Sequence, residues 1–400
     1  MAYYIFFFFS LLGFLQAGSL TTLPTQFDGD PNQISVNCCY ISKLNQVFYT
    51  WSDAGDQLVH YSVYDLSKKT FDKDNLSVQG SSPSGLVCCC YDSKDNVVFL
   101  SWKEQDNSAN FSAYTAATGN MTSPNDIIDG TQTLVSGDIV ACCYNKANDK
   151  VIFSWFDDGN TNDYPKFYIL DSVEPVVIAQ EAVAGDVYCC SSDSDKVYFS
   201  YCANKTPKIA QVFSYDVKEF TSDSVSSISG VQPNNSIFCS YDSKNKVPII
   251  SWAEGSPTFS PYYAICNSKT PQAKSVTTDG YTEVPNSTNV ASCFSTFDSS
   301  ILFSWIDLND NKCYYAVLNT KSNFFTTPAT PIDSAFVIQG SIINSCYISK
   351  TNQIFLSGVG GSPPSNFPWY AIYSSTIPSG GTTLNDAINK FSPVKFQKGI

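Results

Sequence analysis

A segment of 13 residues that occurs seven times limits the possible folds of this 400-residue chain more than any other feature. It first appears as CYISKLNQVFYTW at 39–51, returns as CYDSKDNVVFLSW at 90–102, and changes gradually along the chain. The copies end at Trp51, Trp102, Trp155, Tyr201, Trp252, Trp305 and Gly358, at intervals of 46 to 53 residues. A near-constant period of this size predicts one supersecondary unit repeated many times.

Each repeat has the pattern of β-strands. Runs such as VFYTW at 47–51 are β-branched and aromatic with a period of two, and SKLN at 42–45 has the composition of a turn, so the segment predicts a hairpin. An aromatic third strand follows, as at 58–65, and then a more polar fourth, as at 75–79. Seven sets of four antiparallel strands predict an all-β fold, a single seven-bladed β-propeller over 19–400. The expected blades lie near 30–82, 83–133, 134–181, 182–230, 231–284, 285–336 and 337–400.

The two ends of the chain predict how the ring closes. Residues 21–40 resemble 326–347, which join a fourth strand to the next blade. Either a strand near 20–29 or the tail at 382–400 could therefore complete the seventh blade, and the sequence does not decide between them. In architecture the chain resembles secreted propeller repeat proteins of the kelch-like and sialidase-like kind. It lacks the Gly-Gly doublet of kelch repeats and the Ser-x-Asp-x-Gly-x-x-x-Trp box of sialidases, so no function follows from this resemblance.

The amino terminus predicts export. Residues 2–17 form an apolar run of 16 residues, shorter than the roughly 20 needed to span a bilayer, which favours a signal peptide at 1–18 over an uncleaved anchor. No other segment is apolar and long enough to span a membrane. In a eukaryotic host six sequons would mark a glycoprotein, and they begin at Asn75, Asn110, Asn120, Asn204, Asn234 and Asn286.

Charge excludes several functions. The net charge is -13, all 23 basic residues are Lys, and His60 is the one histidine. A multi-His metal centre and an arginine clamp for phosphate or carboxylate are therefore excluded, and nucleic acid is not an expected partner. His60 lies on an aromatic strand, where a structural role is favoured over catalysis.

Twelve of the 15 cysteines recur on the first strand of the repeats, often as adjacent pairs. Since adjacent strand residues face opposite ways, we favour buried packing near the axis over disulfides or a thiolate metal ring. The three cysteines outside this column, Cys202, Cys266 and Cys313, are the better disulfide candidates.

Loops after the Trp-bearing strand carry the binding candidates. Five copies continue as Trp-x-acid, which predicts a ring of carboxylates formed by Asp53, Glu104, Asp157, Glu254 and Asp307. Solvated surface charge is the simpler interpretation of this ring. Two repeats depart from the pattern, and their loops supply the specificity candidates Lys205, Lys208, Phe367 and Trp369. The Trp residues in general are expected to anchor the blades.

One loop resembles half of a calcium site. Asp158, Asn160, Asn162 and Asp163 have the spacing of calcium ligands, without the terminal bidentate Glu of an EF-hand. Turns rich in Asn, Asp and Gly look the same for backbone reasons, and we favour that interpretation, with no cofactor.

The favoured function is a secreted, non-enzymatic module that presents its loops to a glycan or an extracellular protein. A carbohydrate-active enzyme that uses paired carboxylates is the main alternative, since carboxylates are the abundant acid–base groups. A structural or adhesive surface protein is a third.

Overall fold

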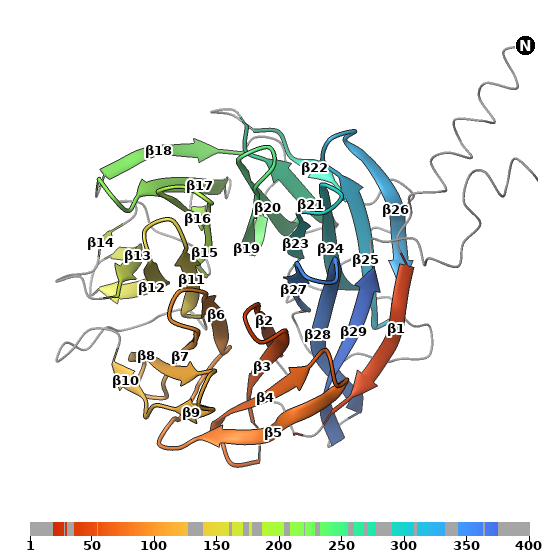
Figure 1. Cartoon of the computed structure of the whole chain (residues 1–400). Coiled ribbons are helices and arrows are strands. Elements are labelled where there is room, and N and C mark those ends of the chain that lie inside the picture. The colour runs from red at the N-terminus through yellow and green to blue at the C-terminus, as the bar shows by residue number, and fades with distance from the viewer. Residues whose placement is uncertain are drawn as a thin grey trace, which may run out of the picture.

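The computed structural model describes residues 19–27, 29, 36–53, 55–126, 139–159, 162–170, 176–177, 186–203, 209–219, 221–228, 233–254, 260–267, 271–276, 290–307, 310–332, 343–362 and 365–374. In this part of the chain the regular structure is all β, arranged as seven antiparallel sheets around an axis (Figure 1). No helix among these residues is long and apolar enough to cross a membrane. The expected signal peptide at 1–18 and the tail at 382–400 lie outside the described residues.

Each sheet is one blade of a propeller, with its first strand nearest the axis (Figure 1). Blade 1 consists of β2 (Asn37–Ile41), β3 (Gln46–Ser52), β4 (Val59–Asp65) and β5 (Thr70–Val78). Blade 2 consists of β6 (Cys88–Asp92), β7 (Val97–Lys103), β8 (Ala109–Thr115) and an outer strand in two pieces, β9 (Asn120–Met121) and β10 (Asn125–Asp126). Blade 3 consists of β11 (Ala141–Asn145), β12 (Lys150–Gly159), β13 (Asn162–Ile169) and β14 (Val176–Val177). Blades 4 and 5 consist of β15 (Tyr188–Ser191), β16 (Lys196–Ala203), β17 (Ile209–Asp216) and β18 (Thr221–Ser227); and β19 (Pro233–Asp242), β20 (Val247–Glu254), β21 (Pro261–Ile265) and β22 (Lys274–Ser275). Blades 6 and 7 consist of β23 (Ala291–Ser295), β24 (Ser300–Asp307), β25 (Lys312–Asn319) and β26 (Phe324–Pro331); and β27 (Asn344–Ile348), β28 (Gln353–Ser362), β29 (Ser365–Ser374) and β1 (Ser19–Gln26).

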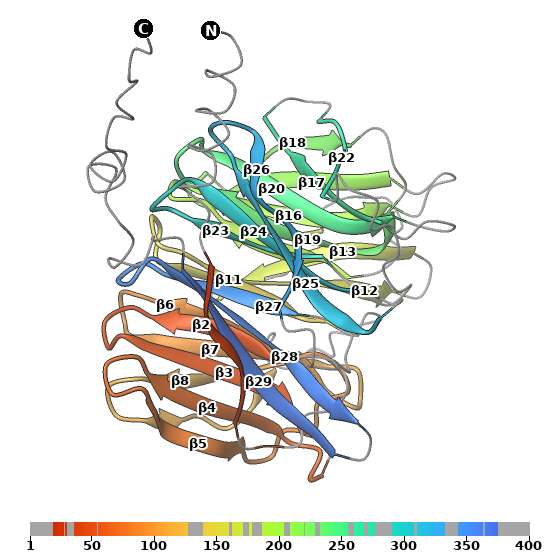
Figure 2. The ribbon, with the colours of Figure 1, turned by 90° about the vertical axis from the view of Figure 1, so that its right-hand side faces the viewer.

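The amino-terminal strand closes the ring. β1 pairs antiparallel with β29, from Ser19 opposite Ser374 to Gln26 opposite Trp369, so the start of the chain supplies the outer strand of blade 7 (Figure 2). The structure thus decides between the two termini, and the first strand is the one that closes the ring. Pairing β1 in this way covers the edge that β29 would otherwise expose.

The two faces of the disc differ in their loops. One face carries the four-residue turns between the first two strands of each blade, at 42–45, 93–96, 146–149, 192–195, 243–246, 296–299 and 349–352, and we call it the turn face. In six of these turns the last residue has a positive φ near 60°, as in Asn45 and Asn352, a conformation that Asn and Asp tolerate well. The opposite face, where the Trp-bearing second strands end, is called the Trp face.

Neighbouring turns hold one another on the turn face. Lys43 Nζ donates to the carbonyl of Lys94 at 2.7 Å, and Lys94 in turn forms an ion pair with Asp149 of blade 3. The hydrogen bond from Lys94 lowers the pKa of the Asp149 carboxyl. Contacts of this kind join successive blades and make the inner part of the turn face a rigid platform.

Apolar packing between blades forms the core. Phe48 of blade 1 stacks on Tyr61 at a centroid distance of 5.4 Å and meets Tyr114 of blade 2 at 5.1 Å. All six Trp side chains are less than 2 % exposed, which confirms their expected role as anchors. Aromatic pairs at these distances add to the free energy gained by burial itself.

In five of the seven blades a buried serine hydroxyl before the Trp position donates a hydrogen bond to the next blade; Thr50 instead donates to His60 of its own blade, and Ser304 makes no such bond among the described residues. Ser101 Oγ donates to the carbonyl of Val140 at 2.6 Å, and Ser357 Oγ donates to the carbonyl of Val36 at 2.8 Å across the closing blades. Ser154, Ser200 and Ser251 make the equivalent bonds to Val187, Ile237 and Val290. Each bond satisfies a carbonyl at the start of the next blade, which explains why Ser recurs before the Trp position.

Candidate functional site

The predicted carboxylates lie at the ends of the second strands, on the Trp face, and the described ones are largely buried. Asp53, Glu104 and Asp307 are 7 %, 8 % and 1 % exposed, and Glu254 is half-buried. The side chain of Asp157 lies outside the described residues. Burial removes the three carboxylates from solvent, so they do not form an exposed acidic surface.

The Trp-x-acid pattern has a structural cause. Residues two apart on a strand point to the same side, so the carboxylate can reach the indole of the preceding Trp. Glu104 Oε1 accepts from Trp102 Nε1 at 2.7 Å, and Asp53 Oδ2 accepts from Trp51 Nε1 at 3.3 Å. Glu104 also accepts from the backbone N–H of Ser82 at 2.7 Å and from its hydroxyl. Asp53 and Glu104 therefore satisfy buried donors, namely the indole of their own blade and, for Glu104, Ser82 in the segment between β5 and β6. In blade 5 the pattern does not have this effect, because Trp252 Nε1 makes no hydrogen bond among the described residues.

The single histidine lies between polar partners near this edge of blade 1. His60 Nε2 is 2.9 Å from Asp56 Oδ2, and Nδ1 is 2.6 Å from Asn75 Oδ1. Burial alone would raise the pKa of Asp56, but the hydrogen bonds from His60 and from the backbone of Leu58 lower it. One potential ligand atom from each of Asp53, Asp56 and His60 lies within 4.8 Å of the others, and they are the one such group among the described residues. Because both nitrogens of His60 already have partners, the contacts fit the structural role predicted for it.

The candidates from the two divergent repeats are placed as follows. Trp369 is fully buried and pairs with Gly358, the residue that stands where most blades have Trp. A Cβ on Gly358 would lie 2.9 Å from the Trp369 ring, so the indole fills the space that the missing Trp leaves. Phe367 is half-buried on the same strand, while Lys205 and Lys208 lie outside the described residues.

The calcium-like sequence in blade 3 forms a hairpin. β12 runs through Gly159 and β13 starts at Asn162, with Asp158 opposite Asp163 in register. The side chains of this stretch, and Asn160 as a whole, lie outside the described residues, so calcium binding here stays a prediction.

None of the three disulfide candidates forms a disulfide in the structure, so that prediction is wrong here. Cys202 and Cys313 are buried and Cys266 is half-buried. The disulfide in the structure instead joins two cysteines of the first-strand column, Cys190 and Cys239. The other ten column cysteines form no disulfide in the structure, and most of them are buried near the axis.

Sequence reasoning missed two neighbouring grooves on the turn face. The first, of about 510 Å³, lies between blades 5 and 6. Its lining residues are Asn245, Val247, Ile265, Asn267, Pro271, Gln272, Lys274, Thr320 and Asn323. The second, of about 570 Å³, lies on blade 6 beside the first. Its lining residues are Phe297, Asp298, Ser299, Asn319, Lys321, Ser322 and Thr326. Both volumes are of the size that takes a small ligand.

Hydrogen bonds fix the walls of these grooves. Asn245 Nδ2 donates to Thr320 Oγ1 at 3.2 Å, and Lys274 Nζ donates to Asn323 Oδ1 at 3.2 Å, both from blade 5 to blade 6. Lys244 Nζ donates to the carbonyl of Phe297 at 3.0 Å. The amide and hydroxyl groups are therefore held in place before any ligand arrives.

Two exposed phenyl rings accompany the grooves. Phe297, in the wall of the second groove, is 53 % exposed, and Phe324, next to Asn323 of the first, is 74 % exposed. They are the most exposed large apolar side chains among the described residues. Exposed aromatic rings beside amides and hydroxyls form a mixed surface, neither apolar nor strongly charged.

No protein-family model matches the chain, and no curated protein matches it in sequence. Solved structures do share its fold. A fungal alcohol oxidase in complex with copper has a TM-score of 0.59 at 12% identity, covering 90% of this chain and 76% of the other. An ulvan lyase bound to a saccharide has a TM-score of 0.57 at 8% identity, covering 88% and 95%. A mutant of AofleA from Arthrobotrys oligospora has a TM-score of 0.53 at 9% identity, covering 90% of each chain. At these identities the likeness identifies the chain by its fold alone, as a seven-bladed β-propeller.

Proposed function

We propose that this protein is a secreted, non-enzymatic module that binds a glycan in the two grooves of its turn face. The observation that carries the proposal is the exposure of Phe297, which lines the second groove among amide and hydroxyl groups, and of Phe324, which follows the groove residue Asn323 in the chain. Amides both donate and accept hydrogen bonds, which suits the hydroxyls of a sugar, and an exposed ring offers a flat apolar surface.

The charge of the grooves favours a neutral or weakly acidic glycan. Lys274 is the one charged residue among those that line the first groove, and the second has one acid and one base, Asp298 and Lys321. This balance contrasts with the net charge of -13 on the chain. An acidic sugar would therefore meet little electrostatic repulsion from the groove walls, although the protein as a whole is acidic.

Two of the solved structures with this fold belong to a polysaccharide lyase and an oligogalacturonate lyase. A carbohydrate ligand is in keeping with that use of the fold, although the proposal rests on the grooves and not on the likeness. Export remains part of the proposal, with the signal peptide at 1–18 as its basis. The amino terminus of the mature protein, read by mass spectrometry, is expected after Ala17 or Gly18.

A glycan array followed by calorimetry on the best binder tests the proposal. Truncation of an aromatic anchor typically costs about 2 kcal/mol or more, so Phe297→Ala and Phe324→Ala are each expected to weaken binding about 30-fold. Leu44→Ala is the matched control, because Leu44 is an exposed apolar residue (39 %) on a turn of the same face in blade 1. An array with no binder, or Phe variants that bind like the wild type, would contradict the proposal. If the protein hydrolyses chromogenic glycosides, and a single Asp or Glu substitution abolishes that hydrolysis, the result would instead favour a carbohydrate-active enzyme.

A further inference from the structure

The first strands of neighbouring blades contact one another around the axis, and we call each of these seven contacts a seam. The seams join β2 to β6, β6 to β11, β11 to β15, β15 to β19, β19 to β23, β23 to β27, and β27 back to β2. They form a closed circle, so every first strand takes part in two seams.

Each first strand brings two adjacent side chains to its seams, in the same register in all seven blades. In blade 1, Cys38 lies opposite Tyr49 and Cys39 opposite Phe48. The equivalent pairs of residues in blades 2 to 7 are Cys89 and Cys90, Cys142 and Cys143, Cys189 and Cys190, Cys239 and Ser240, Ser292 and Cys293, and Ser345 and Cys346. Since adjacent side chains of a strand point in opposite directions, one faces the preceding blade and the other the following blade.

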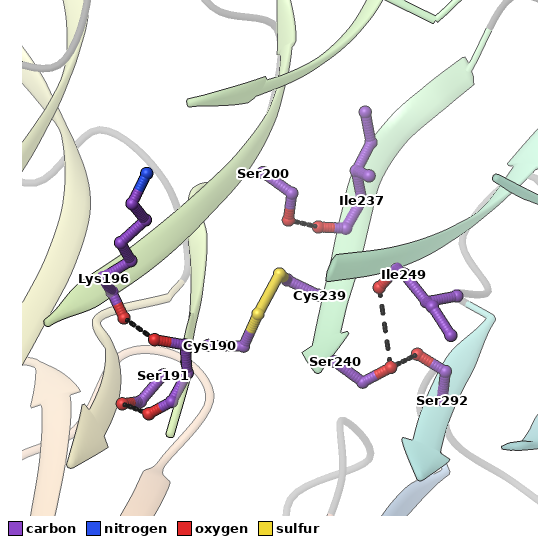
Figure 3. Close-up of a disulfide and its surroundings, with 10 residues drawn as sticks. Cys190, Ser191, Lys196, Ser200, Ile237, Cys239, Ser240, Ile249 and Ser292 are labelled. Atoms are coloured by element: carbon purple, nitrogen blue, oxygen red, sulfur yellow. Dashed lines mark hydrogen bonds between the residues drawn. A yellow bond between two sulfur atoms is a disulfide. The ribbon is translucent and has the colours of Figure 1, made fainter. Parts of the chain in front are cut away.

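The seam between blades 4 and 5 shows what this register permits. Cys190, the second member of the pair in blade 4, is joined by a disulfide to Cys239, the first member of the pair in blade 5, with a Cα–Cα distance of 5.6 Å (Figure 3). At the next seam the equivalent residues are both serines, and their hydroxyl oxygens, of Ser240 and Ser292, are 3.1 Å apart (Figure 3). The same two positions therefore meet at both seams.

Four other seams bring two thiols together in the same way. The register pairs Cys39 with Cys89, Cys90 with Cys142, Cys143 with Cys189, and Cys346 with Cys38, and the neighbouring thiol contributes to the raised pKa of Cys89, Cys90, Cys143 and Cys346. At the remaining seam the residues in this register are Cys293 and Ser345. Five of the seven seams thus have a cysteine in both positions, in the register that brings Cys190 and Cys239 to a Cα–Cα distance of 5.6 Å, which a disulfide requires.

We propose that all five Cys–Cys seams are disulfides in the mature protein, so that covalent bonds join blades 7, 1, 2, 3, 4 and 5 in succession. In each bridge two protein thiols lose two protons and two electrons, and a disulfide oxidant of the secretory compartment is reduced to two thiols. The oxidation rests on the proposed export, because the reducing cytosol would keep these cysteines as thiols.

The bridges form during folding. Burial and the neighbouring thiol raise the pKa of Cys89, Cys143 and Cys346 well above its ordinary value, so these thiols are protonated and unreactive once the ring is closed. Exchange with an external disulfide requires a thiolate and access to it. Both are available while the first strands are still in contact with water.

The number of free thiols tests the proposal directly. Ten of the 15 cysteines are paired, so maleimide labelling of the secreted protein in denaturant, without reductant, is expected to modify five: Cys88, Cys202, Cys266, Cys293 and Cys313. Peptide mapping of the unreduced protein then gives the five cross-links. A count of 13 would show that the bridge between Cys190 and Cys239 stands alone and would overturn the proposal.

Two variants change the count in directions that simple packing does not predict. Cys39→Ser removes one cysteine but releases Cys89, so the count rises from five to six; with unbridged thiols it would fall by one. Ser345→Cys adds a cysteine opposite the free Cys293, so the count falls from five to four; with unbridged thiols it would rise. Ser345→Cys replaces one small side chain by another at the seam of Cys293 and Ser345, so it keeps the test valid should Cys39→Ser fail to fold.

If either variant moves the number of free thiols in the other direction, the proposed bridges are refuted. The count is independent of glycan binding, so its failure and the failure of the proposed function are distinguishable.

Discussion

The substitution Glu104→Gln tests whether the Glu104 carboxylate stabilises the fold through the hydrogen bonds that it accepts. Glu104 is 8 % exposed and accepts hydrogen bonds from Trp102 Nε1 and from the backbone N–H of Ser82, both at 2.7 Å. A glutamine keeps the shape but has one oxygen and one NH₂ group. Whichever way the amide turns, one of these two N–H donors faces an amide nitrogen in place of an oxygen.

The expected loss follows from that one donor. Leaving a buried donor without an acceptor costs about 1–3 kcal/mol, and the remaining bond loses the strength that a charged acceptor gives. We therefore expect Glu104→Gln to lower the free energy of unfolding by about 2–3 kcal/mol. Trp102 is buried beside the substitution, so tryptophan fluorescence during unfolding by urea reports the change, which should appear as a lower midpoint at an unchanged slope.

A matched control makes the same change in charge at the surface. Glu219 is exposed, and Glu219→Gln is expected to alter the free energy of unfolding by less than about 0.5 kcal/mol. Glycan binding on the turn face should survive Glu104→Gln, because Glu104 lies on the Trp face. If the two variants are equally stable, or if Glu104→Gln abolishes binding at full stability, the structural role assigned to the carboxylate is refuted.

Three further predictions concern other parts of the ring. Ser101→Ala removes a hydrogen bond between blades and should lower the free energy of unfolding in urea by about 1–3 kcal/mol. Ser112→Ala removes a buried hydroxyl that makes no hydrogen bond among the described residues, so it should be neutral or stabilising, and equal costs for the two variants would contradict this. Gly358→Trp should destabilise blade 7 by about 1–3 kcal/mol or more, and adding Trp369→Tyr, which recreates the Trp–Tyr pair of blade 6, should recover most of the loss in a double-mutant cycle. The lowered pKa of Asp149 stabilises the fold above the ordinary carboxyl value of 3.8, and this contribution disappears as the pH falls through the folded pKa; the urea midpoint should therefore drop from pH 5 to pH 3, and drop less in Asp149→Asn.

The sequence allowed prediction of features that the repeat itself encodes. Seven hairpins, their turns and the buried Trp positions follow from a period of two within a period near 50. The likeness of 21–40 to 326–347 made the first strand one of two candidates for closing the ring, and the structure was needed to choose it. The role of Glu104 was missed although its signal was present. Residues two apart on a strand share a side, which places the acid beside the indole of Trp102.

The grooves could not be predicted in the same way. Asn245 and Thr320 meet across two blades although 75 residues separate them, and nothing in either local sequence indicates this contact. The cysteine pairs are an intermediate case. Alternation along the strand shows that Cys38 and Cys39 face different neighbours, but only the ring geometry shows which cysteine each one meets.

Closure of the ring by β1 has a consequence for the order of synthesis. The strand at Ser19–Gln26 is made early in synthesis, whereas its partner β29 ends only at Ser374. At roughly 5–20 residues per second, about 20–70 seconds pass before the partner exists. Until then the blades that have already folded form an open arc, which has unpaired backbone N–H and C=O groups at both ends. Such edges can pair with other chains, and this exposure ends only when β29 has been made and the ring closes.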